Sequence, residues 1–333
     1  MSCEWINLIY TDMKKLMAVA VGLMTLVSSC VTEDEGCGEL IESRLVSPQI
    51  SASLADENSN LSALTGILEI YPCKAGTSIY YGNVINGNVT PFYATYEIVD
   101  GQIYDEGYNR ELHLPMGTYN LVYWGTPKYE EPIYSTPSIE TPGFTVGMDL
   151  NEAHFELRQN SDGTYNPVYD LVYAVKSVNV GAEDLKVDLK RAVAGLKVIV
   201  KKKNNGLFNS NVTGMTVRVT GIAERLNFYT AQPSGEAKTV KFDLVASADR
   251  SEMTNATVML FPSVEQPKVI LDIKLKDGSV HTVEKELTST FMANTKLTLN
   301  IVVGEIYPGG NTGDFTIENW FETSETIEFP VIS

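Results

Sequence analysis

The sequence predicts an all-β protein made of two β-sandwich domains. Its 333 residues contain short runs rich in β-branched residues and tyrosine, and Gly, Asn, Asp and Pro separate these runs. The runs recur about every 8 to 12 residues, as the strands of sandwiches do. No segment carries apolar residues at helical spacing over a full window of about 11 residues. These observations favour packed antiparallel sheets over a parallel sheet covered by helices.

In the first half, turn-forming residues separate the expected strands. The pairs Asn86-Gly87 and Asp100-Gly101 suit the positive φ angles of tight hairpins. Pro115 and Gly117 indicate a turn or bulge just before a strand. The predicted strands cover residues 65–71, 77–84, 92–99, 102–104, 118–124, 154–157 and 168–178.

The second half shows a cleaner alternation of apolar and polar residues. Leu196, Val198 and Val200 fall on one face of a strand within residues 185–203, although residues 191–195 also fit a turn of helix. Asp277-Gly278 is expected to close a hairpin. The predicted strands cover residues 185–203, 215–222, 240–245, 256–261, 268–275, 279–287, 295–303, 314–320 and 326–331.

The chain divides into a leader, a tether and two domains. Residues 1–29 are expected to be a leader and signal peptide, and residues 30–60 a polar, acidic tether with at most one edge strand. A length of about 300 residues then suits two domains of ordinary size. The boundary is placed between 61–185 and 186–333, where a tyrosine-rich half gives way to a half that carries most of the lysines. No Pro/Gly/Ser-rich linker marks this boundary, so the domains are expected to abut.

A short apolar run near the start has the order of a bacterial lipoprotein signal. It begins with Lys14 and Lys15, continues through residues 16–27, and ends in Ser-Ser before Cys30. The run is too short for a permanent membrane helix, which needs about 20 residues. We therefore expect Cys30 to receive lipid and to become the new N-terminus. The start codon is Met1 or Met13, and the position of the lysines favours Met13.

The charge of the chain excludes nucleic acid as a partner. The formal net charge is −17 and the isoelectric point is about 4.6. Such an acidic chain has no electrostatic attraction for nucleic acid or for an anionic membrane surface.

The four cysteines leave one candidate pair. Cys3 lies in the leader and Cys30 is the predicted lipid attachment site, so Cys37 and Cys73 remain. In an exported chain these two residues either form a disulfide or stay as separate thiols.

The sequence offers no catalytic set. His113, His154 and His281 stand alone, without the short spacings of zinc sites, and no nucleophile elbow or phosphate-binding loop is present. We expect no enzymatic activity, no cofactor and no metal site, with a hydrolase as the remote alternative. The 17 tyrosines either stack on sugars or, as at Tyr119 and Tyr123, pack within the sheets.

Three motifs carry a resemblance to a known family. They are LPMGTYNLVYWG at 114–125, LKRAVAGLKV at 189–198 and NTKLTLNIV at 294–302. With the lipoprotein signal and the two β-rich halves, they resemble the fimbrillin superfamily, the lipoprotein subunits of type V fimbriae. The first motif is similar to the fimbrial anchor branch in particular.

The resemblance implies a structural role and a fold of two tandem transthyretin-like sandwiches. The expected partners are other fimbrial subunits, joined by donor-strand exchange, and the outer membrane, reached through lipid. The acidic residues after Cys30 resemble a tag that sends lipoproteins to the outer face of that membrane. In stalk subunits a protease cuts after Arg or Lys behind the tether, and Arg44 stands where such a cut would fall. Anchors keep their lipid.

Several alternatives stay open at this level. The resemblance favours an anchor over a stalk or tip subunit, and a surface glycan-binding lipoprotein is a further alternative. The C-terminal segment alternates around Phe315, Ile317 and Trp320. It is expected to act either as a donor strand or as the closing strand of the second domain.

Overall fold

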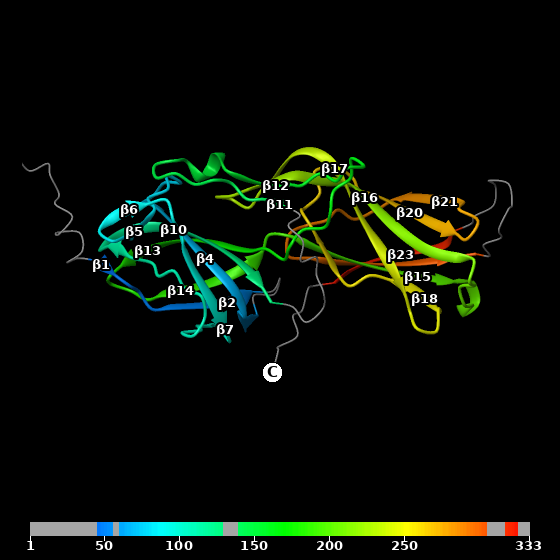
Figure 1. Cartoon of the computed structure of the whole chain (residues 1–333), viewed down its shortest axis with the longest axis horizontal. Coiled ribbons are helices and arrows are strands. Elements are labelled where there is room, and N and C mark those ends of the chain that lie inside the picture. Colours follow the sequence, from blue (N-terminus) through cyan, green and yellow to red (C-terminus); the bar gives the residue numbers. More distant parts are fainter. Residues whose placement is uncertain (1–44, 56–59, 129–138, 305–316, 326–333) are drawn as a thin grey trace, which may run out of the picture. The chain divides into compact units, whose positions relative to one another are not determined.

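The computed structural model describes residues 45–55, 60–128, 139–304 and 317–325 (Figure 1). Strands form nearly all of the regular structure in these ranges. Only two short 3₁₀ turns interrupt them, η1 (Leu150–Glu152) and η2 (Lys203–Asn205). The predicted all-β fold is confirmed.

The first sheet closes on itself through its N-terminal strand. Its eight strands pair in the order β14-β13-β10-β4-β7-β8-β2-β3, and β14 also pairs with β2. That last pairing is parallel, whereas the others are antiparallel. The strands are β2 (Ile50–Ala55), β3 (Leu61–Ala63), β4 (Gly66–Lys74), β7 (Ala94–Val99), β8 (Gln102–Ile103), β10 (Gly117–Pro127), β13 (Val172–Val180) and β14 (Leu185–Arg191).

Two short pairs of strands complete the first half. They are β1 (Leu45–Val46) with β9 (Leu114–Pro115), and β5 (Asn83–Ile85) with β6 (Asn88–Thr90).

The second assembly is a sandwich of eleven strands. In one layer β16 pairs with β12, β17 and β20, and in the other β15 pairs with β18, β19 and β22. Side chains of both layers share one core, and the β17–β18 pairing connects the layers. The strands are β11 (Ile139–Glu140), β12 (His154–Leu157), β15 (Ala194–Lys202), β16 (Val212–Asn227), β17 (Pro233–Ala246), β18 (Glu252–Thr254), β19 (Val258–Leu260), β20 (Lys268–Leu275), β21 (Val280–Glu286), β22 (Lys296–Val303) and β23 (Ile317–Glu325).

Sheet membership does not change at a single residue of the chain. Strands β11 and β12 precede β13 in sequence but pair with the second assembly, whereas β14 still pairs in the first sheet. The domain limits 61–185 and 186–333 stay a prediction. Near these limits, strands of the first sheet and strands of the second assembly alternate along the chain.

The hairpin turns follow from the sequence. Asn86 and Gly87 both have positive φ angles, 52° and 74°, and Asp100 and Gly101 have 49° and 80°. Both predictions are confirmed. The hairpin between β20 and β21 also forms, but there only Gly278 has a positive φ angle, of 86°.

Residues 77–84 form less strand than predicted. Isolated bridges occur at Ile79 and Tyr80, and the regular strand β5 begins only at Asn83. Gly76 and Gly82 flank this stretch with left-handed φ angles of 68° and 91°, which interrupt a continuous ladder.

The alternative of a helical turn at residues 191–195 is wrong. Strand β14 ends at Arg191 and β15 begins at Ala194, with a bend between them. The N–H of Ala192 donates to the carbonyl of Leu171, so a contact distant in sequence holds this bend.

The central strands of the first sheet are buried on both faces. Along β10, Leu121 and Tyr123 belong to the core of the first sheet, whereas Val122 and Trp124 belong to the core of the second assembly. Because successive side chains of a strand point to opposite faces, one strand serves two cores. The neighbouring strand β4 does the same.

Aromatic rings fill the junction between the two cores. The Trp124 ring centroid lies 4.8 Å from that of Phe155, 4.7 Å from that of Tyr173 and 5.6 Å from that of Phe228. Its indole Nε1–H donates to the backbone carbonyl of Phe228 at 3.0 Å. Trp124 thus joins β10 to the second assembly by packing and by a buried hydrogen bond.

We expect Trp124→Ala to lower the free energy of unfolding by about 3–5 kcal/mol, because it leaves a large cavity between the cores. Trp124→Phe should cost about 1–3 kcal/mol, since the Phe228 carbonyl loses its donor. Urea denaturation followed by circular dichroism measures both values. Val245→Ala, at a side chain that is 71% exposed, is the control and should change stability by less than about 0.5 kcal/mol. Equal midpoints for Trp124→Ala and the control would contradict the shared core.

Candidate assembly site

The first described strands, β1 and β2, lie within residues 30–60, the range predicted to be a tether with at most one edge strand. In β1, Leu45 and Val46 pair with Pro115 and Leu114 of β9. Strand β2 then pairs with β14 from Ile50↔Leu185 to Leu54↔Leu189. The chain therefore joins the first sheet at Ile50, five residues after its described part begins.

Strand β2 contributes apolar side chains to the first core. Ile50, Ala52 and Leu54 are buried, with exposed fractions of 4%, 3% and 5%. On the opposite face, the Ser53 hydroxyl donates to Asp188 Oδ1 at 2.5 Å. Withdrawal of β2 would uncover apolar side chains together with the backbone groups of β14 that pair with it. Strand β2 therefore fills a groove that is formed by the edge of β14 and the apolar side chains of the first core.

Three predicted site residues of the N-terminal region lie outside the described residues. They are Cys30 for lipid, Cys37 for a disulfide and Arg44 for cleavage. All three stay predictions. Leu45, the residue that would follow a cut at Arg44, is the first residue of β1.

Cys73 is a buried free thiol in the core of the second assembly. Burial, reinforced by the negative charge of Asp149, raises the pKa of this thiol to about 12. The side chain therefore stays protonated and inert near neutral pH. A disulfide between Cys73 and Cys37 stays a prediction.

The C-terminal candidate strand forms an edge of the second assembly. Strand β23 runs antiparallel to β22, with Ile317 opposite Val303 and Trp320 opposite Ile301. Phe315 lies outside the described residues. Whether this strand closes its own domain only or also serves as a donor stays a prediction.

A buried ion pair that the sequence analysis missed lies at the end of β14. Arg191 Nε is 3.2 Å from Asp170 Oδ1, and both side chains are almost completely buried. Burial raises the pKa of the Asp170 carboxyl and lowers that of the Arg191 guanidinium. The available signal is the charged Arg191 at a position where the alternation of β14 predicts an inward side chain.

Tyr119, Tyr123 and the three histidines all lie in or beside strands of the described structure. Tyr119 and Tyr123 are buried in the first core, so their rings pack within the sheet. His113 Nε2 lies 3.3 Å from Glu111 Oε2. His154 lies on β12 and His281 on β21. Within the described ranges, no group of three or more His, Cys, Asp or Glu side chains is placed to hold a metal ion.

Comparisons with known proteins give one family and a shared fold. Residues 46–326 match the family model described as fimbrillin-A associated anchor proteins Mfa1 and Mfa2. The fimbrial anchor protein Mfa2 of Porphyromonas gingivalis is 12% identical, with a TM-score of 0.50 over 84% of this chain and 98% of that one. A candidate polysaccharide-binding protein of Bacteroides thetaiotaomicron is also 12% identical, with a TM-score of 0.50 over 84% of this chain and 99% of that one. Among curated proteins, none matches this sequence.

We expect Cys73 of the native protein to resist alkylation by iodoacetamide at pH 8 and to react in urea, because its thiol is buried and protonated. Peptide mass spectrometry separates this cysteine from the others. The pKa rises from 9.0 to about 12 on folding, so the unfolded chain releases its proton first and the free energy of unfolding falls as the pH passes from 9 toward 12. Rapid labelling of the native protein, or a Cys37–Cys73 peptide found without reduction, would contradict a free buried thiol.

Proposed function

The chain belongs to the family of fimbrillin-A associated anchor proteins, and we propose that it is the lipid-linked subunit that attaches a fimbria to the outer membrane. Membership of this family makes the chain a fimbrial structural protein of the cell surface rather than an enzyme. It associates with other fimbrial subunits. The proposal adds how this protein attaches to the membrane and how it binds the next subunit of the filament.

Lipid at Cys30 would supply the attachment to the membrane. Across the described residues, no helix has the length and hydropathy to cross a bilayer. The net charge of −17 gives the protein no attraction for an anionic surface. Because a single acyl chain binds membranes only marginally, stable attachment needs two or more, as lipoprotein processing provides. The signal ending at Cys30 therefore supports an acyl anchor.

The observation that carries the assembly proposal is the place of β2 in the first sheet. This strand lies near the N-terminal end of the described chain, pairs in parallel with β14, and fills the first core with Ile50, Ala52 and Leu54. An extended segment of a partner, with apolar residues at every second position, could take its place by β-augmentation. Each buried Ile or Leu of such a segment would contribute about 1.5–3 kcal/mol.

A stalk or tip subunit is the second candidate, and the position of Arg44 supports it. A cut after Arg44 would leave Leu45 as the N-terminus, at the first residue of β1. Strands β1 and β2 would then no longer be connected to the tether, and they could leave their place in the first sheet. In the anchor, the same residues would stay joined to the lipid-bearing cysteine.

We expect the N-terminus of the protein purified from the cell surface to be an acylated Cys30, identified by mass spectrometry. Cys30→Ala should move the protein out of the outer-membrane fraction, whereas Arg44→Ala, the matched control, should leave it there. An N-terminus at Leu45 would identify a stalk or tip subunit instead. Absence of the protein from any fimbrial polymer after mild detergent extraction would count against both.

A disulfide between β2 and β14 tests the strand exchange. We expect Ala52→Cys with Val187→Cys, which are opposite in the register, to block assembly under oxidising conditions and to restore it after reduction. Ile85→Cys with Asn88→Cys, across the β5–β6 hairpin, is the control and should assemble in both conditions. Electron microscopy and gel mobility of extracted fimbriae measure the polymer. Normal assembly of the oxidised β2–β14 variant would exclude displacement of β2.

A further inference from the structure

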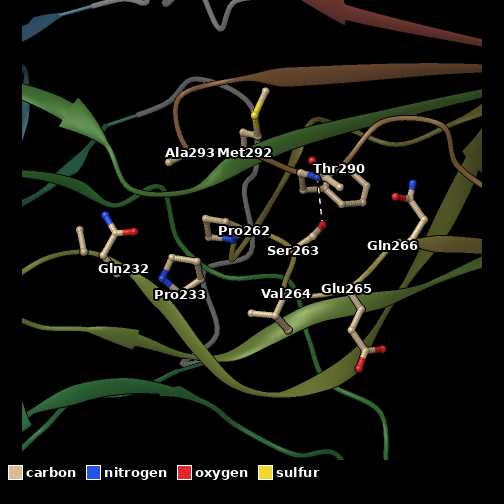
Figure 2. Close-up of a pocket in the computed structure, with 12 residues that line it drawn as sticks. Gln232, Pro233, Pro262, Ser263, Val264, Glu265, Gln266, Thr290, Met292 and Ala293 are labelled. Atoms are coloured by element: carbon tan, nitrogen blue, oxygen red, sulfur yellow. Dashed lines mark hydrogen bonds between the residues drawn. The ribbon is translucent and has the colours of Figure 1, made fainter.

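Three segments of the second assembly line an open surface pocket of about 470 Å³. They are residues 231–233 at the start of β17, residues 262–266 after β19, and residues 290–293 before β22 (Figure 2). The N–H of Phe291 donates to Ser263 Oγ at 3.0 Å, and the N–H of Ser263 donates to the Phe291 carbonyl at 2.8 Å. These bonds tie two of the loops together, so the pocket is a formed feature of the fold.

The lining of the pocket suits an extended apolar peptide. Met292 and Val264 expose 57% and 38% of their surfaces and give the pocket an apolar part. In Figure 2 they lie on either side of Pro262. Side chains that can bond a peptide backbone stand among the apolar ones: Gln232, Ser263, Gln266 and Thr290. Glu265 is the one charged residue of the lining.

The last described residue of β23 lies close in the sheet to one of the lining loops. Glu325, the final residue of β23, pairs with Lys296, the first residue of β22. The lining loop 290–293 ends three residues before Lys296. The eight residues that follow Glu325 therefore start beside the pocket, and they reach at most about 28 Å from there.

The sequence of these eight residues matches the lining. Residues 326–333 read TIEFPVIS, in which Ile327, Phe329 and Val331 recur at every second position. In an extended segment these three side chains share one face, and Glu328 falls on the other. Pro330 lacks an N–H group, so it suits a docked segment better than a strand inside a sheet.

We propose that this pocket is the docking site for residues 326–333 of the same chain. The C-terminal segment covers Met292 and Val264 and caps this end of the sandwich. The chain leaves β23 next to the pocket, so this segment has a high effective concentration at the pocket. A segment from another molecule lacks this advantage. While seated, the segment is not available to another subunit.

Oxidation of methionine by hydrogen peroxide tests the docking on the full mature chain. Met292 and Met116 have similar exposed fractions in the described structure, 57% and 62%, so Met116 of the first half is an internal control. In the intact protein Met292 should oxidise several-fold more slowly than Met116. Deletion of residues 326–333, or Phe329→Asp in the full chain, should raise the rate at Met292 to that at Met116. Peptide mass spectrometry measures both rates.

Two further measurements decide between occupants. The peptide TIEFPVIS, added to the deletion variant, should slow oxidation of Met292 again, whereas a scrambled peptide should not. Protection in a monomer, at a level independent of protein concentration, is expected for a segment of the same chain. Protection found only in dimers would assign the pocket to the segment of a second copy and overturn the proposal. Equal rates at Met292 and Met116 in the intact protein would also overturn it, with circular dichroism verifying that each variant is folded.

Discussion

The double burial of β4 and β10 is the constraint on which the rest of the structure depends. Alternate side chains of β10 pack into different cores, so neither core can be completed without this strand. Rings of Trp124, Phe155 and Phe228 fill the junction, and the indole N–H satisfies a backbone carbonyl there. A load on one half of a fimbrial subunit would therefore pass to the other through packed side chains instead of a linker.

Closure of the first sheet gives the N-terminal strand its importance. Without β2, the strand β14 would present an unpaired edge above an apolar core, which is the feature that most soluble proteins avoid. In a subunit that joins other subunits, the same edge is useful because it can be completed by another chain. The proposed assembly rests on the pairing of β2, which lies near the start of the described residues.

The Asp170–Arg191 pair fixes the place where the chain passes from one sheet to the other. Arg191 ends β14, and β15 of the second assembly begins three residues later, at Ala194. A buried pair of this kind contributes little net stability compared with apolar residues, yet the loss of one partner leaves an uncompensated buried charge. The pair therefore favours one arrangement of this bend over others.

The sequence by itself determined the all-β class, the hairpin turns and most strands, because alternation and turn residues such as Asn86-Gly87 are local signals. It also predicts that Cys30 ends a lipoprotein signal. The tertiary structure decided that Leu121 to Trp124 face two cores, since a run of apolar residues is the same whether one face or both are covered. Only tertiary structure could join β2 to β14 or Asp170 to Arg191. Such contacts depend on which distant strands meet, and no local pattern encodes that.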